Sequence, residues 1–187
     1  MKEELLDFYK QAKMNLINHG YNSEIHLVHE REFKHQTKKN FYWEYVYVVL
    51  NSGLSNKVAE KIYADFILKG PRAVNHLGKR AAIKRASLSF QEWFRKLQSM
   101  PTDEEKIEYL GKLSYLGPAT KYHLARNLGI DCAKPDRHLN RLATQFGYKD
   151  DVQKMCKELS VATGDRVGTI DIVLWRNATI KSEKIPG

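Results

Sequence analysis

The sequence predicts an all-α protein, and three observations lead to that prediction. Apolar residues recur at helical spacing along most of the 187-residue chain. Glycines and Gly-Pro pairs stand where these periodic segments end. Only Phe41–Leu50 is strand-like, and no second segment of that kind exists to pair with it. We expect one all-α domain over 1–187, which can divide into two helical lobes, at about 41–100 and at 1–40 plus 101–187.

The first half of the chain contains three expected helices. Glu3–Asn18 has helical apolar spacing, and Gly20 is placed to end it. Phe41–Leu50 is interpreted as a buried helix, and Leu54–Leu68 repeats apolar residues at every fourth position. Gly70-Pro71 then interrupts the chain.

The second half begins with a long helix, Lys79–Gln98. Thr102 and Glu105 form a capping-box pattern that opens the next helix, which is expected to end near Leu113. The remaining expected helices are Arg137–Phe146, Asp150–Ala162, and a last helix, Ile170–Ala178, capped by Thr169. The tail Lys181–Gly187 is expected to fray.

The chain is basic, with 31 Lys and Arg against 22 Asp and Glu and a formal net charge of +9. Such a charge suits a polyanionic partner such as nucleic acid, although a plain basic protein has the same balance. A basic cluster at the start of the Lys79–Gln98 helix is expected to be a solvated face rather than a DNA contact. Its members are Lys79, Arg80, Lys84 and Arg85.

Metal and membrane sites are not expected. Cys132 and Cys156 are too few for a four-cysteine cluster and fit a reducing compartment. The histidines of the polar segment 26–40 have irregular spacing, so a loop or helix face is the preferred interpretation. Without an apolar signal core or a run of about 20 apolar residues, we expect a cytoplasmic protein.

The most informative stretch, Leu113–Arg141, reads as a tight hairpin, a helix, a loop and an aspartate that opens another helix, all expected in one compact unit. Gly117 is expected to adopt positive φ and admit a phosphate, with Pro118 in the first turn of the next helix. Exposed N–H groups and Lys121 would attract the anion. An ordinary helix–turn–helix corner without a ligand is the equal alternative.

Asp136 follows Lys134-Pro135 and stands at an expected helix N-cap. A capping aspartate is common and needs no further role. A carboxylate held ionised at a helix N-terminus would also stabilise positive charge on a sugar ring or orient a water molecule. The two roles are compatible.

With these residues in view, Leu113–Gly147 resembles the helix-hairpin-helix DNA glycosylase superfamily, which includes endonuclease III and 3-methyladenine glycosylases. Gly117 matches the second hairpin glycine and Asp136, 19 residues later, the essential aspartate. The resemblance implies a compact multi-helix domain, a catalytic Asp136, a monovalent cation at the hairpin, and no other cofactor. It implies DNA contacts at Tyr115, Leu116, Gly117, Pro118, Ala119, Thr120, Lys121, Arg137 and Arg141. The weaker match upstream implies a base pocket near Asn51, Ser52 and Trp43.

The chain also departs from the family pattern. Tyr115 stands at the first hairpin glycine, and Ala119 at the lysine of members with lyase activity. Lys121 lies two residues further, roughly 200° around the helix, and is expected to point away. Gly53 stands where relatives carry a glutamine after the early helix, so the sequence does not indicate which base is recognised.

Three functions follow as hypotheses. The first is a monofunctional DNA glycosylase, a monomeric, nucleoid-associated enzyme that flips a modified base and hydrolyses its glycosidic bond. The second is group transfer to a modified thymine on the same fold. The third is a DNA-binding module without enzymatic activity.

Overall fold

The computed structural model describes residues 2–183, and within them all regular structure is helical. The predicted all-α class is therefore confirmed. The helices form two compact units. Unit 1 contains residues 1–32 and 129–187, and unit 2 contains residues 33–128.

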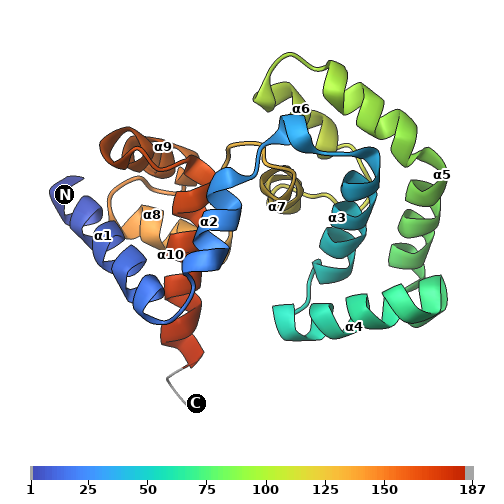
Figure 1. Ribbon diagram of the computed structural model, residues 1–187, viewed down its shortest axis with the longest axis horizontal. Coiled ribbons are helices and arrows are strands. Elements are labelled where there is room, and N and C mark those ends of the chain that lie inside the picture. Colours follow the sequence, from blue (N-terminus) through green and yellow to red (C-terminus); the bar gives the residue numbers. More distant parts are fainter. Residues whose placement is uncertain (1, 184–187) are drawn as a thin grey trace. The chain divides into compact units, whose positions relative to one another are not determined.

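Unit 1 is built around the last helix of the chain. Its helices are α1 (Lys2–Asn18), α2 (Asn22–Glu30), α8 (Arg137–Gln145), α9 (Val152–Thr163) and α10 (Val167–Glu183). Helix α10 packs against the other four, so both ends of the chain share one core (Figure 1). Fully buried members of that core include Leu16, Leu139, Met155, Ile170 and Val173. Burial of such side chains is the main favourable term in folding.

Two polar clusters tie the N-terminal helices to the C-terminal part of unit 1. The carboxylate of Asp165 accepts hydrogen bonds from the Tyr9 hydroxyl (2.7 Å) and from Lys13 Nζ (2.7 and 2.8 Å). Arg176 forms a two-point pair with Glu24 at 2.6 and 3.0 Å. Both clusters join residues that are far apart in the sequence, which local patterns cannot predict.

Unit 2 is built around α3 (Lys38–Asn51), which packs against α4 (Asn56–Lys69), α5 (Leu77–Ser99) and α7 (Thr120–Asn127). Helix α6 (Asp103–Leu110) packs against α5 and α7, and the short helices η1 (Phe33–His35) and η2 (Gly70–Ala73) connect the larger ones. The buried-helix interpretation of residues 41–50 is correct, since Phe41, Tyr45 and Val49 are fully buried. The predicted capping box of Thr102 and Glu105 is also present.

Arg166 holds together the two places where the chain passes between units. Its guanidinium donates to the carbonyl oxygens of His29 (3.1 Å), Gly129 (2.9 Å) and Arg31, and lies 3.6 Å from the carboxylate of Asp131. Asp131 in turn accepts a hydrogen bond from the Gly168 amide at 3.0 Å, and so caps the first turn of α10.

Several sequence expectations are corrected. The stretch Leu113–Arg141 is not one compact unit, because it divides after Leu128: α7 packs on α3 and α6, whereas α8 packs on α9 and α10. Residues 33–40 and 101–128 likewise lie with unit 2, since Phe33 contacts Phe94 at 6.1 Å between ring centroids and Lys106 lies over the Phe33 ring.

Helix boundaries and burial also differ in places. Thr169 does not cap the last helix, because the Asp131 cap starts α10 at Val167 and Thr169 is buried within it. Leu54, Val58 and Leu88, expected at apolar positions, are exposed. Helix α10 continues to Glu183, and the rest of the tail, residues 184–187, lies outside the described residues.

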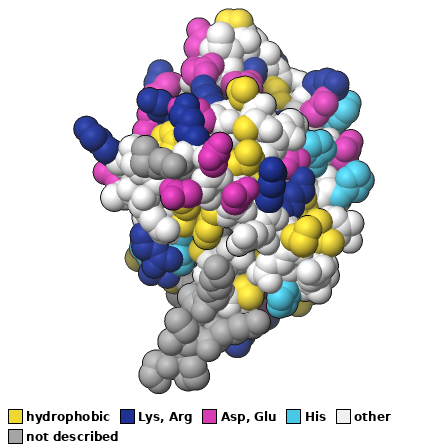
Figure 2. Space-filling view, turned by 90° about the vertical axis from the view of Figure 1, so that its left-hand side faces the viewer, with side chains coloured by type: hydrophobic (Ala, Val, Ile, Leu, Met, Phe, Trp, Pro, Cys, Tyr) yellow, Lys and Arg dark blue, Asp and Glu magenta, His cyan; other side chains and the backbone are white. Residues whose placement is uncertain are grey.

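Charge is mixed on the face seen in Figure 2, where basic and acidic side chains alternate with apolar ones between them. This face therefore does not concentrate the net charge of +9 into one basic patch. Among the described residues, no helix has the length and apolar character that crossing a membrane requires.

Replacing Arg166 should destabilise unit 1. Arg166→Met removes the hydrogen-bond donor for the carbonyls of His29, Arg31 and Gly129 and the charged partner of Asp131. We therefore expect the free energy of unfolding to fall by about 2–4 kcal/mol. Urea unfolding followed by circular dichroism measures it. Arg141→Met, which removes an exposed arginine of α8, is the matched control and should change the free energy by less than about 0.5 kcal/mol. Equal effects of the two variants would contradict the assigned role.

Candidate functional site

Asp136 caps α8 with one carboxylate oxygen. Its backbone is extended (φ −91°, ψ 175°), and Oδ1 accepts hydrogen bonds from the amides of His138 (2.9 Å) and Leu139 (3.1 Å). The predicted N-cap is therefore confirmed. The other oxygen, Oδ2, makes no hydrogen bond to the part of the chain that the structure describes. One oxygen thus fixes the side chain while the second accepts no hydrogen bond from the described residues, and the positive end of the helix dipole stabilises the negative charge.

The segment before Asp136 is held by two side chains that sequence analysis missed. Gln153, from the first turn of α9, bonds both the amide and the carbonyl of Ala133. Asp171, fully buried on α10, accepts from the amide of Lys134 at 2.7 Å. No local pattern indicates these contacts, because they join residues 20 and 37 positions apart.

Two arginines lie on the outer face of α8. Arg137 and Arg141 are exposed, four positions apart and so on one side of the helix. His138 between them is partly buried, and burial lowers its pKa, with Asp136 opposing and the nearby arginines adding to the shift. A neutral His138 can accept the hydrogen bond that Arg137 Nε donates to its Nε2 at 3.3 Å. The face therefore offers cationic groups suited to phosphate.

The hairpin in unit 2 differs from the sequence expectation at Gly117. Its φ is not positive; the residue in the left-handed region is Tyr115, with φ 66°. The Gly117 amide is also committed, because it donates to Thr120 Oγ1 at 2.7 Å, while that hydroxyl bonds the Tyr115 carbonyl at 3.2 Å. Buried Leu116 anchors the turn.

The start of α7 offers a different pair of amides to an anion. The Lys121 amide bonds the Gly117 carbonyl at 3.0 Å, which closes a turn over Pro118. Helix α7 begins only at Thr120, with Ala119 as its N-cap, so Pro118 precedes the first turn in which it was expected. The amides of Ala119 and Thr120 have no hydrogen-bond acceptor within residues 2–183, and no side chain caps this end of the helix. These two N–H groups are therefore uncommitted at a helix N-terminus, a position that favours an anion.

Three carbonyl groups of the hairpin accept hydrogen bonds from within the chain. The Ser114 carbonyl accepts from the Tyr45 hydroxyl at 2.9 Å, the Tyr115 carbonyl from Thr120, and the Gly117 carbonyl from Lys121. No cluster of three or more His, Cys, Asp or Glu side chains suited to a metal occurs in the described part of the chain.

Tyr115 packs against the first turn of α5. Its ring meets His76 edge to face, with centroids 5.9 Å apart, and its hydroxyl lies 3.4 Å from His76 Nδ1. The same nitrogen accepts from the Lys79 amide at 3.3 Å and so caps α5. A Cβ at Gly78 would lie 2.0 Å from the Tyr115 hydroxyl, so a larger residue there would require the Tyr115 ring to shift away from the helix.

Lys79 is buried and was wrongly predicted to lie on a solvated basic face. Its Nζ donates to the carbonyls of Leu50 (2.9 Å) and Ser52 (2.6 Å), where α3 ends, and burial lowers its pKa. Lys79 therefore fixes the turn that carries Asn51 and Ser52. Arg80 is also committed, to the Val74 carbonyl at 2.7 and 2.9 Å.

Trp43 of the expected base pocket, and the two residues considered for the lysine position, lie in unit 2. Trp43 packs into an aromatic cluster with Tyr63 and Phe66 of α4, at 6.4 and 6.2 Å between centroids. Lys121 pairs with Glu108, which directs its ammonium group toward α6. Ala119 is the N-cap residue of α7 and has only a methyl side chain.

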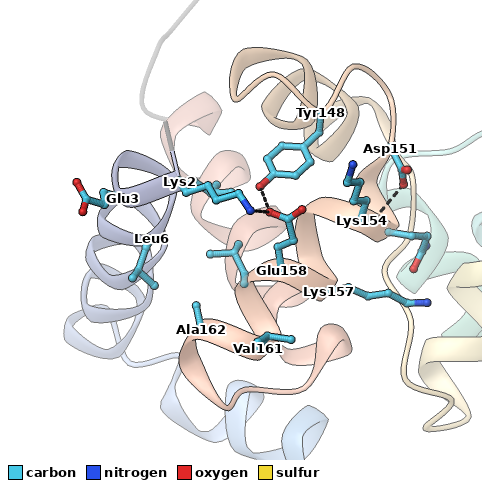
Figure 3. Close-up of a pocket in the computed structure, with 13 residues that line it drawn as sticks. Lys2, Glu3, Leu6, Tyr148, Asp151, Lys154, Lys157, Glu158, Val161 and Ala162 are labelled. Atoms are coloured by element: carbon cyan, nitrogen blue, oxygen red, sulfur yellow. Dashed lines mark hydrogen bonds and ion pairs between the residues drawn. The ribbon is translucent and has the colours of Figure 1, made fainter.

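A groove of about 760 Å³ lies between α1 and α9 in unit 1. Its floor includes Leu5 and Leu159, and its polar groups pair with one another: Lys2 and Tyr148 both point to the carboxylate of Glu158, at 3.1 and 2.7 Å (Figure 3). Burial and Glu158 raise the pKa of Tyr148 to about 12, so its hydroxyl stays a donor. None of the residues predicted for the site lines this groove.

Comparison with known proteins gives a match in structure only. No family model matches the chain, and no curated protein matches it significantly. The fold is similar to that of the 8-oxoguanine DNA glycosylase of Thermotoga maritima, with a TM-score of 0.68 and 17% identity over 94% of this chain and 96% of that one. It is also similar to the 8-oxoguanine DNA glycosylase of Methanocaldococcus jannaschii, with a TM-score of 0.72 and 15% identity over 99% and 97% of the two chains.

The chain has the fold of these two proteins. The predicted resemblance to DNA glycosylases is thereby confirmed as a resemblance of fold. The match spans nearly the whole of each chain, so both units take part in it.

Removing the buried ammonium group should loosen the end of α3. In Lys79→Met the carbonyls of Leu50 and Ser52 lose their donor, and we expect the free energy of unfolding to fall by about 1–3 kcal/mol. Lys84→Met removes the same charge from an exposed position on the same helix and should leave stability unchanged. Urea titration of both variants measures the difference, and unaltered stability of Lys79→Met would contradict the capping role.

Proposed function

We propose that this protein is a monofunctional DNA glycosylase, which hydrolyses the N-glycosidic bond of a damaged or modified base. The observation that carries the proposal is Asp136, whose Oδ1 caps α8 while Oδ2 has no partner in the described residues. The fold shared with two 8-oxoguanine DNA glycosylases along nearly the whole chain supports it. The net charge of +9 suits DNA as the partner.

Asp136 has the properties that glycosidic cleavage requires. As the bond to the base breaks, positive charge develops on the deoxyribose ring. A carboxylate oxygen fixed next to that ring stabilises the charge, or orients the water that attacks it. Because Oδ1 is already bound by two amides, the carboxylate needs little reorganisation when the charge appears.

Each unit, taken by itself, has groups that suit contact with DNA. Arg137 and Arg141 supply charge beside Asp136, and the amides of Ala119 and Thr120 supply a phosphate site at the hairpin. The turn of Asn51 and Ser52, fixed by Lys79, is the proposed wall of the base pocket. The two proteins with this fold act on 8-oxoguanine, and this base is the first candidate substrate. We place the enzyme in the cytoplasm, at the nucleoid.

Mass spectrometry of DNA incubated with the protein tests the proposal. The panel contains 8-oxoguanine and alkylated, deaminated and hydroxymethylated bases. Loss of one base, leaving an intact abasic strand, is the expected result and names the substrate. Added mass with every base retained would indicate group transfer instead. Tight, salt-dependent binding without any product would indicate a DNA-binding module.

Asp136→Asn should abolish most turnover without unfolding α8. Asparagine is as good an N-cap as aspartate, so the helix is kept. The lost negative charge should lower the single-turnover rate by about 100-fold or more, while DNA binds as well or more tightly. Asp151→Asn changes another capping aspartate of unit 1, which bonds the Lys154 amide at 2.9 Å, and should keep the wild-type rate. Full turnover by Asp136→Asn would exclude Asp136 as the catalytic group.

Lyase activity should be absent. The family's lysine position is Ala119, and Lys121 is paired with Glu108. Sodium borohydride added during turnover therefore should trap no covalent protein–DNA complex, and the abasic strand should stay uncut until it is treated with alkali. A trapped complex that disappears in Lys121→Met would show that Lys121 leaves Glu108 and attacks the sugar.

A further inference from the structure

The segment that leads to Asp136 is irregular, yet the backbone polar groups of Ala133, Lys134 and Asp136 are hydrogen-bonded. Residues 133–136 belong to no helix. The amide and carbonyl of Ala133 both bond Gln153, and the amide of Lys134 bonds Asp171. The Asp136 amide donates to the Lys134 carbonyl at 2.8 Å, which closes a three-residue turn over Pro135. The Asp136 carbonyl accepts from Asn140 at 2.8 Å, the first bond of α8.

Gln153 differs from the other side chains that bind this segment, because it forms two hydrogen bonds with a single residue, Ala133. Its amide nitrogen donates to the Ala133 carbonyl and its amide oxygen accepts from the Ala133 amide, at 3.2 Å. Two opposed bonds to one residue fix the orientation of its backbone as well as its position. Gln153 is itself fixed, since it lies in the first turn of α9, which Asp151 caps.

The short segment between Ala133 and Asp136 couples the fixed position of Ala133 to the position of the Asp136 carboxylate. Ala133 is fully buried and cannot shift without losing its packing. The ring of Pro135 fixes its own φ and keeps Lys134 extended. The turn between Lys134 and Asp136 then sets where the Asp136 side chain leaves the backbone. The position of Oδ2 therefore depends on the two bonds made by Gln153.

We propose that Gln153 is a positioning residue that sets the place of the Asp136 carboxylate for the reaction. The inference rests on the proposed function, in which Oδ2 of Asp136 faces the sugar. Gln153 acts through Ala133 and does not touch the substrate. A catalytic oxygen displaced by about 1 Å can lower a rate by about 100-fold, so two hydrogen bonds 17 positions downstream of Asp136 are enough to control turnover.

Three variants test the inference. Gln153→Met keeps the length of the side chain and removes both bonds. Gln153→Glu keeps the acceptor for the Ala133 amide and sets an oxygen against the Ala133 carbonyl. Gln145→Met makes the same change at an exposed glutamine of α8 and is the matched control. Each variant is measured for single-turnover rate, DNA affinity, melting temperature, and amide hydrogen exchange at residues 133–139.

Gln153→Met is expected to lower the single-turnover rate at least tenfold, with DNA affinity within twofold of wild type. Faster exchange at the amides of Lys134, His138 and Leu139 should accompany it, because the cap of α8 is loosened. Gln153→Glu should fall between Gln153→Met and wild type, and Gln145→Met should match wild type. A wild-type rate for Gln153→Met, or an equal loss in the control, would overturn the proposal.

Failure of the proposed function would look different. In that case the wild-type protein removes no base from any substrate. Amide hydrogen exchange at residues 133–139 then becomes the only test of the role of Gln153. Unchanged exchange at His138 and Leu139 in Gln153→Met would then overturn the positioning role as well. Faster exchange there, at an unchanged melting temperature, would support control of the Asp136 carboxylate by Gln153 whatever the ligand is.

Discussion

Unit 1 depends on the guanidinium group of Arg166, because this unit is made from two parts of the chain that are separated by all of unit 2. Arg166 binds carbonyls on both sides of the interruption, those of His29 and Arg31 before it and that of Gly129 after it. It also lies beside Asp131, whose other contact caps α10. One planar, multiply donating group therefore joins the end of α2, the return of the chain and the start of the central helix.

Local signals in the sequence were sufficient for most helices and for Asp136. A capping box, an N-cap aspartate and a helix-ending glycine act over three or four residues, and these are the features that the structure confirms. Helical periodicity misplaced Leu88 on α5, which is exposed although Ile83, Phe94 and Leu97 of the same helix are buried. The all-α fold could be predicted from the sequence because these local patterns all indicate helices along the chain.

The contacts that sequence analysis missed are those between distant residues. Lys79 and the Leu50 carbonyl are 29 positions apart, and Asp131 and the Gly168 amide are 37 apart. No pattern within one helix shows that a lysine turns inward to cap another helix. The hairpin adds a different failure, since a glycine was expected at positive φ but Tyr115 adopts it, compensated by the contact of its ring with His76.

The order of unit 1 along the chain has a consequence for synthesis on the ribosome. Helices α1 and α2 are made first, but α10, on which both pack, is made last. Unit 2 is a continuous segment between them and can fold as soon as it has emerged. Until residues 167–183 follow, Leu5, Tyr9 and Leu16 have no core to enter. The apolar face of α1 therefore stays unburied until α10 has been made.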